Sequence, residues 1–189
     1  MVKPRKREVI AFCGFEQSGK DYSCRILMDT MGFKKVAFAD ALREVAFKTL
    51  GMTVEEGMSN YEELKTNPIY KDLTFRNILE NLGSSIRRYD KTFWAKTVLV
   101  KIAQSFENIC ISDLRYANEY KVVKRYCDEH SIEFKLVFCD YHSAKYNDKN
   151  PHESARLAKY LKSLGYKDQE YVREADIDSY ICFLNGGNY

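Results

Sequence analysis

The sequence predicts an α/β fold in which a parallel sheet of about five strands carries helices on both faces. Short β-rich apolar runs alternate along the chain with longer stretches of helical periodicity. The 189 residues, 45% of them hydrophobic, suffice for one well-buried core but not for two ordinary domains. A loop containing two glycines directly follows the first apolar run. We therefore expect a single domain over residues 1–189.

The expected strands are continuous apolar runs, as strands buried on both faces require. They are Val9–Cys13, Val36–Ala39, Ile109–Ser112, Phe134–Cys139 and Tyr180–Leu184. Between the second and third runs, residues 40–108 are mostly of helical character and exceed a simple crossover connection. We expect a helical insertion there.

Composition narrows the class of function. The net charge of +3 is too small for a dedicated nucleic-acid binder, although it suits a site that receives phosphates. The six cysteines include no C-x-x-C pair and are typical of reduced core thiols. The basic segment Lys3–Arg7 is interpreted as a solvated tail, with a localisation or nucleic-acid patch as the alternative. The apolar run after it, Val9–Gly14, is too short for a signal peptide or a membrane span. We expect a cytoplasmic protein without nucleic-acid or membrane partners.

The chemistry begins after the first expected strand, where the chain fits G-x-x-x-x-G-K and continues into a helical stretch that reaches about Met31. Such a loop wraps a phosphate with backbone N–H groups, while the helix N-terminus adds partial positive charge. Lys20 can reach the β- and γ-phosphates of a nucleotide, and is the first catalytic candidate. The alternative is a flexible surface turn. The candidate ATP-binding residues are Gly14, Gln17, Ser18, Gly19, Lys20, Asp21 and Tyr22.

Two carboxylates are candidates for holding Mg²⁺. Asp21 stands where this motif usually has a Ser or Thr that binds the ion, so we expect it to act through water. Asp113 follows the third expected strand, and ligands gather beyond the carboxyl ends of parallel strands. It can hold Mg²⁺ through water while Arg115 reaches the transferring phosphoryl group, and both are catalytic candidates. Alternatively, Asp113 caps the helix expected to start near Ala117.

The insertion contains a candidate acceptor site. An apolar helical stripe is assigned to the core and comprises Phe75, Ile78, Leu79, Leu82 and Ile86. Arg76, Glu80, Gly83 and Arg87 fall within about 60° of one another on a neighbouring stripe. The two arginines can clamp a phosphate, with room for the ligand at Gly83. The alternative is a solvated face on which Arg76 pairs with Glu80.

Two further segments leave alternatives open. Asp40 ends the second expected strand and either contacts the acceptor or caps a helix over Ala41–Leu50.

Residues 140–165 are basic and are a candidate lid that closes over the reaction, with Arg156 as the lid residue. A solvated basic face explains this segment equally well. The three histidines do not have the spacing of a metal site.

In the order of these motifs the chain resembles the deoxynucleoside monophosphate kinases of bacteriophages and bacteria, and more distantly animal-type phosphomevalonate kinase, which shares the S-G-K-D loop. The resemblance spans nearly the whole chain, and Asp40 and Asn118-Glu119 match the nucleotide enzymes better. Its motifs are Gly14–Asp21, Phe38–Glu44, Arg76–Arg87 with Trp94 downstream, Asp113–Glu119, His152-Glu153-Ser154 and Asn185-Gly186.

The resemblance implies a P-loop fold like that of nucleoside monophosphate kinases. It implies Mg²⁺ and ATP as phosphoryl donor, and a deoxynucleoside 5′-monophosphate as acceptor. Asp40, Arg76, Glu80, Arg87 and Trp94 are then the acceptor-binding residues. The sequence leaves open the preferred base and whether the chain forms a homodimer.

The chain also departs from the pattern of these relatives. Phe15, Glu16 and Gln17 occupy loop positions where relatives usually carry at least one Lys, and Ala155 stands where a second Glu is usual. Two alternatives therefore accompany the deoxynucleotide kinase. One is phosphomevalonate kinase or another small-molecule phosphate kinase, and the other is a nucleotide-binding regulatory protein with weak or no turnover.

Overall fold

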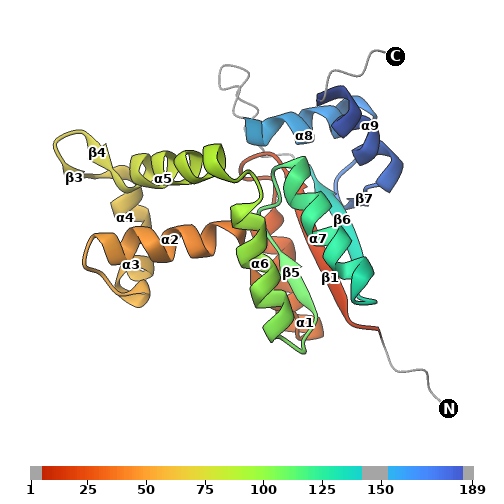
Figure 1. Ribbon diagram of the computed structural model, residues 1–189, viewed down its shortest axis with the longest axis horizontal. Helices are drawn as coiled ribbons and strands as arrows, with labels where there is room; N and C mark the ends of the chain where they lie inside the picture. Colours follow the sequence, from red (N-terminus) through yellow and green to blue (C-terminus); the bar gives the residue numbers. More distant parts are fainter. Residues whose placement is uncertain (1–5, 142–152, 185–189) are drawn as a thin grey trace. The chain divides into compact units, whose positions relative to one another are not determined.

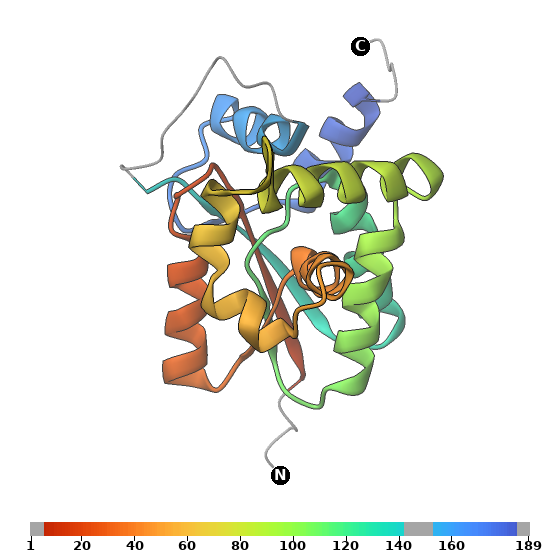
Figure 2. The same cartoon turned by 90° about the vertical axis from the view of Figure 1, so that its left-hand side faces the viewer.

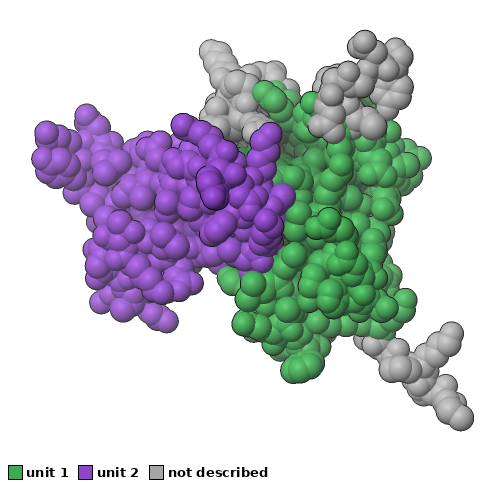
Figure 3. All heavy atoms as spheres, viewed as in Figure 1, with its two compact units in different colours: residues 1–37, 98–189 green, residues 38–97 purple. Residues whose placement is uncertain are grey.

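A computed structural model of the chain describes residues 6–141 and 153–184. The chain divides into two compact units, coloured separately in Figure 3. Unit 1 contains the residues up to Ala37 and those from Val98 onward, and unit 2 contains Phe38–Thr97. Unit 2 thus covers most of the insertion expected at 40–108.

Unit 1 is built on a five-stranded sheet with the strand order β2-β5-β1-β6-β7. The strands are β1 (Glu8–Gly14), β2 (Lys34–Val36), β5 (Ile109–Ile111), β6 (Glu133–Cys139) and β7 (Glu170–Tyr171). The first four are parallel to their neighbours, whereas β7 is antiparallel to β6. The predicted α/β fold with a mostly parallel sheet is confirmed.

Helices cover both faces of this sheet. The helix α1 (Lys20–Met31) packs on one face, where Cys24 and Leu27 join an apolar cluster with Ile10 and Phe12 of β1. On the other face lies α7 (Ala117–Glu129), whose Tyr120 ring meets Phe134 of β6 edge to face at 5.5 Å. Figures 1 and 2 show α1 and α7 on opposite sides of the strands.

The register of the strands brings their carboxyl ends together. β1 and β6 pair along their whole length, so that Gly14 lies opposite Cys139. Val36 of β2 lies opposite Ile111 of β5. Every loop that follows one of these parallel strands therefore leaves from the same edge of the sheet, which is where α/β proteins bind ligands.

The fifth strand was predicted wrongly. Residues 180–184 belong to α9 (Glu174–Leu184) and not to a strand. A short apolar run fits a buried strand and a buried helix equally well. Here Ile177, Tyr180 and Ile181 are buried, which is helical spacing, and Glu174 in the first turn complements the helix N-terminus. The other helix near this end is α8 (Glu153–Ser163).

The second strand is shorter than predicted at its carboxyl end. β2 stops at Val36, and the helix α2 (Phe38–Thr49) begins two residues later. Asp40 consequently lies in the first turn of α2 rather than at a strand end. The residues after Ala37 include good helix formers, and their propensity outweighs the apolar character of the run.

Unit 2 is mostly helical, as expected for the insertion. It contains α2, α3 (Val54–Ser59), α4 (Tyr61–Thr66), α5 (Phe75–Tyr89) and the residues up to Thr97 of α6 (Phe93–Gln104). A small hairpin formed by β3 (Pro68–Tyr70) and β4 (Leu73–Thr74) was not foreseen.

The core of unit 2 is centred on Phe47 of α2 and Phe75 of α5. Their rings stack with centroids 4.6 Å apart and an interplanar angle of 5°. Ile78, Leu79 and Leu82 pack against this cluster, so the stripe predicted as core is confirmed for these residues and Phe75, while Ile86 is half-buried outside the cluster. Within the part of the chain that the structure describes, no helix is long and apolar enough to span a membrane.

Candidate phosphate-binding site

The glycine loop lies between the end of β1 and the start of α1. Gly14, Gln17 and Gly19 have φ angles of 149°, 61° and 89°, so the backbone turns sharply within a few residues. The buried Ser18 donates its N–H to Phe15 O at 3.3 Å, which closes the loop on itself. A loop of this shape at a helix N-terminus concentrates backbone N–H groups in a concave, anion-binding surface.

The ammonium group of Lys20 lies inside this loop. Its Nζ donates to Gly14 O at 3.2 Å, to Ser18 Oγ at 3.3 Å and to Phe15 O. Burial lowers the pKa of Lys20, and the positive charge of Arg115 lowers it further. An ammonium group that is held by carbonyl oxygens can exchange them for phosphate oxygens. The structure therefore places the Lys20 ammonium group within the glycine loop, and its role toward a nucleotide stays a prediction.

Asp21 forms an ion pair that the sequence did not indicate. Lys35 Nζ of β2 lies 2.6 Å from Asp21 Oδ1. Partial burial tends to raise the pKa of Asp21, but the hydrogen bond and charge of Lys35, with a hydrogen bond from Ser112, lower it overall. Asp21 is thus ionised at neutral pH and bridges β2 and the end of β5. Its neighbour Tyr22 is exposed.

A buried carboxylate shapes the loop after β5. Glu119 is only 3% exposed and accepts hydrogen bonds from the N–H groups of Arg115 at 2.9 Å and Tyr116 at 3.1 Å. These bonds give a partner to backbone N–H groups at the start of α7, which begins at Ala117. Asp113 lies outside that helix, and Tyr116 occupies the cap position. The sequence signal for Glu119 was its place three residues after the cap position, as in a capping box.

The carboxylates at this edge fit the requirements of Mg²⁺ in part. The ion commonly takes one or two carboxylates together with phosphate oxygens and water. Asp21 is ionised, and its hydrogen bond with Ser112 brings it next to Asp113 in the chain. No group of three or more potential metal-ligating side chains occurs among the described residues. Asp21 and Asp113 could thus offer the one or two carboxylates that such an ion takes, and their role as metal ligands stays a prediction.

The predicted acceptor residues all belong to unit 2. Arg76 Nε lies 3.7 Å from Glu80 Oε1 and both side chains are about half exposed, so the pair of the alternative interpretation is present. In α2, Arg43 Nη1 lies 3.2 Å from Asp40 Oδ1. Arg87 is partly buried. The structure alone does not assign a ligand to these side chains.

Gly83 and Trp94 serve packing within unit 2. A Cβ atom on Gly83 would lie 3.3 Å from Leu42 Cδ2 and 3.5 Å from Arg87 Nη1. The expectation that Gly83 leaves room for a ligand is therefore wrong, because Leu42 and Arg87 fill the space. Trp94 is 2% exposed and donates its indole N–H to Gly83 O at 3.3 Å.

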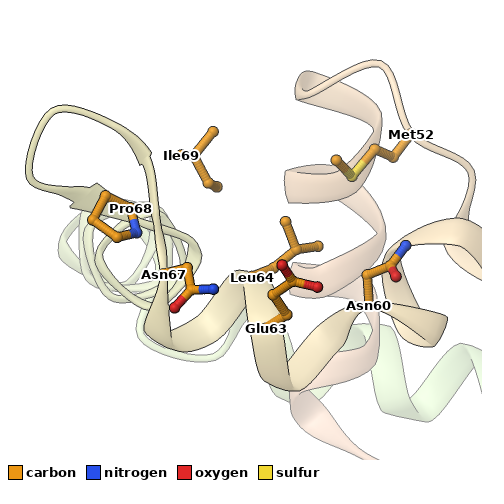
Figure 4. Close-up of a pocket in the computed structure, with 7 residues that line it drawn as sticks. All are labelled: Met52, Asn60, Glu63, Leu64, Asn67, Pro68 and Ile69. Atoms are coloured by element: carbon orange, nitrogen blue, oxygen red, sulfur yellow. The ribbon is translucent and has the colours of Figure 1, made fainter.

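Two cavities are found away from these residues. One of about 280 Å³ lies in unit 2, and Figure 4 shows its lining of Met52, Asn60, Glu63, Leu64, Asn67, Pro68 and Ile69. The other, of about 210 Å³, lies in unit 1 beside Tyr166 and Arg173. None of the predicted site residues lines either cavity, so the cavities do not mark the phosphate site.

The predicted lid lies partly outside the described residues. His142, Lys145 and His152 fall in the segment 142–152, and the side chains of Glu153 and Ser154 and the residues Asn185 and Gly186 are likewise outside the description. Arg156 is an exposed residue of α8. Further along α8, Lys162 Nζ forms an ion pair with Asp140 Oδ2 at 2.9 Å.

Comparisons with known proteins find distant structural matches but no family. No protein-family model matches the chain, and no curated protein matches it significantly. Among solved structures, the APS kinase CysC of Mycobacterium tuberculosis in complex with AMPPNP and APS is 14% identical with a TM-score of 0.40, and the match covers 96% of this chain and 99% of that one. A mutant of that enzyme is 16% identical with a TM-score of 0.39, covering 85% and 98%. A gluconokinase from Sinorhizobium meliloti is 14% identical with a TM-score of 0.36, covering 94% and 75%. Likeness at this level does not identify an activity.

Proposed function

We propose that this chain is an ATP-dependent kinase that transfers the γ-phosphoryl group of Mg·ATP to a deoxynucleoside 5′-monophosphate. The observation that carries the proposal is the position of Lys20. Its ammonium group lies within the glycine loop, between a strand of a parallel sheet and the helix N-terminus that follows. This combination of lysine, N–H groups and helix terminus is suited to the β- and γ-phosphates of a nucleotide.

The residues of unit 1 supply what phosphoryl transfer needs, which is mainly placement and neutralisation of charge. The bond between the γ-phosphorus and the β–γ bridging oxygen breaks, and a new bond forms to an oxygen of the acceptor phosphate. The products are ADP and a nucleoside diphosphate. Lys20 and Arg115 stabilise the charge that develops. Mg²⁺, which we expect Asp21 and Asp113 to hold through water, neutralises phosphate charge when it is bound. No general base is needed because the acceptor phosphate is already an anion near neutral pH.

The identity of the acceptor is the more specific part of the proposal. It depends on the resemblance of the sequence motifs to those of deoxynucleoside monophosphate kinases. Asp40, Arg76, Glu80 and Arg87 are the proposed acceptor-binding residues. Trp94, the fifth predicted residue, is buried and would act indirectly, by holding Gly83 of α5 through its indole N–H. For Arg76 to grip a phosphate, its contact with Glu80 at 3.7 Å must be exchanged for the ligand. Such an exposed pair is weak, at about 0.3–0.5 kcal/mol, so a phosphate dianion can displace it.

One observation favours a second candidate, a nucleotide-binding protein with weak turnover. Asp21 occupies the usual position of the Mg²⁺-binding hydroxyl and is already paired with Lys35 at 2.6 Å. If that pair persists when a nucleotide binds, the support for Mg²⁺ is reduced and binding can occur without efficient transfer.

A coupled assay of ADP release separates these possibilities. The purified chain is incubated with Mg·ATP and, in turn, each deoxynucleoside monophosphate, each ribonucleoside monophosphate and phosphomevalonate. Turnover that is fastest with a deoxynucleoside monophosphate supports the proposal. Turnover with phosphomevalonate alone assigns the chain to the other kinase class. ATP binding by calorimetry without turnover on any acceptor identifies the regulatory alternative.

A further inference from the structure

The glycine loop itself contains little positive charge. Between Gly14 and Ser18 it has Phe15, Glu16 and Gln17, which bring one negative charge and no cation. Lys20 is the single cation within Gly14–Asp21. A triphosphate carries several negative charges, so a further cation near the loop would add to the binding that Lys20, Arg115 and Mg²⁺ provide.

A second ammonium group reaches this loop from a distant part of the sequence. Lys162 of α8 places its Nζ over the ring of Phe15, 5.6 Å from the ring centroid. The carbonyl oxygen of Phe15 accepts a hydrogen bond from Lys20 Nζ. Two ammonium groups thus approach the same loop residue. Lys162 is also paired with Asp140, so an anion bound at the loop would interact with Lys20 and could take the place of that carboxylate at Lys162.

The position of Lys162 is held by contacts that leave its charged end accessible. Its Nζ lies 2.9 Å from Asp140 Oδ2, while the Lys162 side chain is 54% exposed and that of Asp140 only 19%. Asp140 follows β6, the strand whose last residue, Cys139, lies opposite Gly14. The N–H of Asp140 donates to Asp168 Oδ1 at 2.8 Å, which fixes the backbone there. α8 itself packs against β1.

We propose that Lys162 binds the β- and γ-phosphates of ATP and supplies from α8 the positive charge that the glycine loop lacks. This inference rests on the proposed function, because it assigns a further ATP-binding residue to the same site. Asp140 is a positioning residue that keeps the ammonium group beside Phe15. The aromatic ring at Phe15 fits this role, since it attracts a cation without neutralising it.

The test is the affinity for Mg·ATP, measured by titration calorimetry on the complete chain without any acceptor. Lys162→Met keeps the aliphatic stem over Phe15 and removes the charge, so its Kd for Mg·ATP should rise roughly 5- to 30-fold. Lys162→Arg keeps the charge and should stay within about threefold of the wild type. Lys167→Met, which removes an exposed lysine from the loop after α8, is the matched control and should change nothing. AMP lacks the β- and γ-phosphates, so its affinity should be the same in all variants.

A charge-relocation variant makes the test more specific. Phe15→Lys combined with Lys162→Met returns a cation to the loop itself, and should recover most of the lost ATP affinity. The thermal midpoint of each variant controls for folding, and Lys162→Gln replaces Lys162→Met if the latter does not fold. A Kd for ATP within twofold of the wild type in Lys162→Met, or in Lys162→Gln where that variant replaces it, overturns the inference, as does an equal loss of affinity for AMP. If the wild type binds ATP and turns over while Lys162→Met binds ATP normally, this inference fails and the proposed function stands. If the wild type binds no ATP, both fail.

Discussion

Gly14 and Cys139 are so close that a Cβ atom on Gly14 would lie 2.1 Å from the carbonyl oxygen of Cys139. The two residues are partners in the parallel pairing of β1 and β6. The same Cβ atom would lie 2.6 Å from Ser18 Oγ, on the other side of the glycine loop. Gly14 also has a φ of 149°, which residues other than glycine rarely adopt. The loop can therefore leave the sheet in this direction only from a glycine.

Gly14→Ala should destabilise the fold and abolish ATP binding, because either the backbone or the carbonyl of Cys139 must move. Backbone strain alone typically costs about 1–3 kcal/mol, and the clash adds to it. Urea unfolding and ATP calorimetry measure the two effects. Gly32→Ala is the control, since Gly32 also has a positive φ of 68° but open space around it. It should lose about 1 kcal/mol of stability and keep its ATP affinity. Normal ATP binding by Gly14→Ala would show that the loop does not hold the nucleotide.

Lys20→Ala should lower kcat at least ~100-fold, because the ammonium group stabilises charge that grows on the β–γ bridge during transfer. The measurement is steady-state turnover with the best acceptor. Circular dichroism should show an unchanged fold, since Lys20 Nζ donates its hydrogen bonds to the loop's own oxygen atoms in Gly14, Phe15 and Ser18. Turnover near that of the wild type would remove the basis for the phosphate site.

As the pH rises, ATP affinity should begin to fall at a lower pH than it would if Lys20 had the pKa of an ordinary lysine. Burial, with Arg115 nearby, lowers the pKa of Lys20, and binding requires the protonated form. The affinity is therefore complete below the lowered pKa and decreases as the pH rises through it. Calorimetry from neutral to alkaline pH measures this decrease. In Lys20→Arg the guanidinium stays charged, so the alkaline decrease should be absent. The same decrease in that variant would assign the effect to another group.

Asp113→Asn should raise the Mg²⁺ concentration needed for the half-maximal rate several-fold, because a neutral amide is a weaker indirect holder of the ion. Asp113 is not the cap of α7, and urea unfolding of the variant controls for a loss of stability through its other contacts. Rates measured over a range of Mg²⁺ at saturating ATP give the comparison. Asp29→Asn, on the exposed surface of α1, is the control. An identical metal dependence in both variants would exclude Asp113 from the metal site.

The acceptor clamp can be tested by replacing arginine with lysine, which keeps the charge and removes the two-pronged hydrogen bonding. Arg87→Lys should raise the acceptor KM roughly 10- to 150-fold, the value of one lost charge-assisted hydrogen bond, while the ATP KM stays nearly constant. Arg76→Lys should act in the same direction. Arg88→Lys, an exposed neighbour on α5, is the matched control.

Steady-state kinetics with each substrate varied in turn distinguish the clamp from a solvated helix face. If Arg76→Lys and Arg87→Lys both leave the acceptor KM within about twofold of the wild type, the two arginines do not bind the acceptor. An increase in the ATP KM instead would assign them to the donor. Circular dichroism confirms that each variant is folded.

The sequence was sufficient for those parts of the fold that one local pattern determines. β1, the glycine loop and α1 were predicted closely, since a buried strand, two glycines and a helical period follow directly on one another. Residues 180–184 failed because a short apolar run has no period long enough to separate a strand from a helix. The hairpin of β3 and β4 was missed because its residues are exposed and its strands are only three and two residues long.

In the candidate site, the residues within one motif could be predicted and the contacts between motifs could not. Lys20 follows from the spacing of the glycines alone. The pairing of Asp21 with Lys35 depends on how β2 lies relative to the loop, and Lys162 reaches Phe15 only through the packing of α8 on β1. No local sequence pattern predicts how close two residues from different elements will lie. The expectation for Gly83 failed for the same reason, because Leu42 comes from another helix.

The short β7 leaves part of β6 as an edge of the sheet. β7 pairs only with Val137 and Phe138, so in the described chain no strand covers the earlier residues of β6 on that side. An open edge can pair with another molecule and start aggregation. Here Lys135 of this stretch forms ion pairs with Glu8 at 2.6 Å and Glu133 at 3.1 Å. A strand docking on this edge would have to dehydrate these charged groups. The part of β6 that β7 leaves uncovered thus carries charged groups, which disfavour pairing with a further strand.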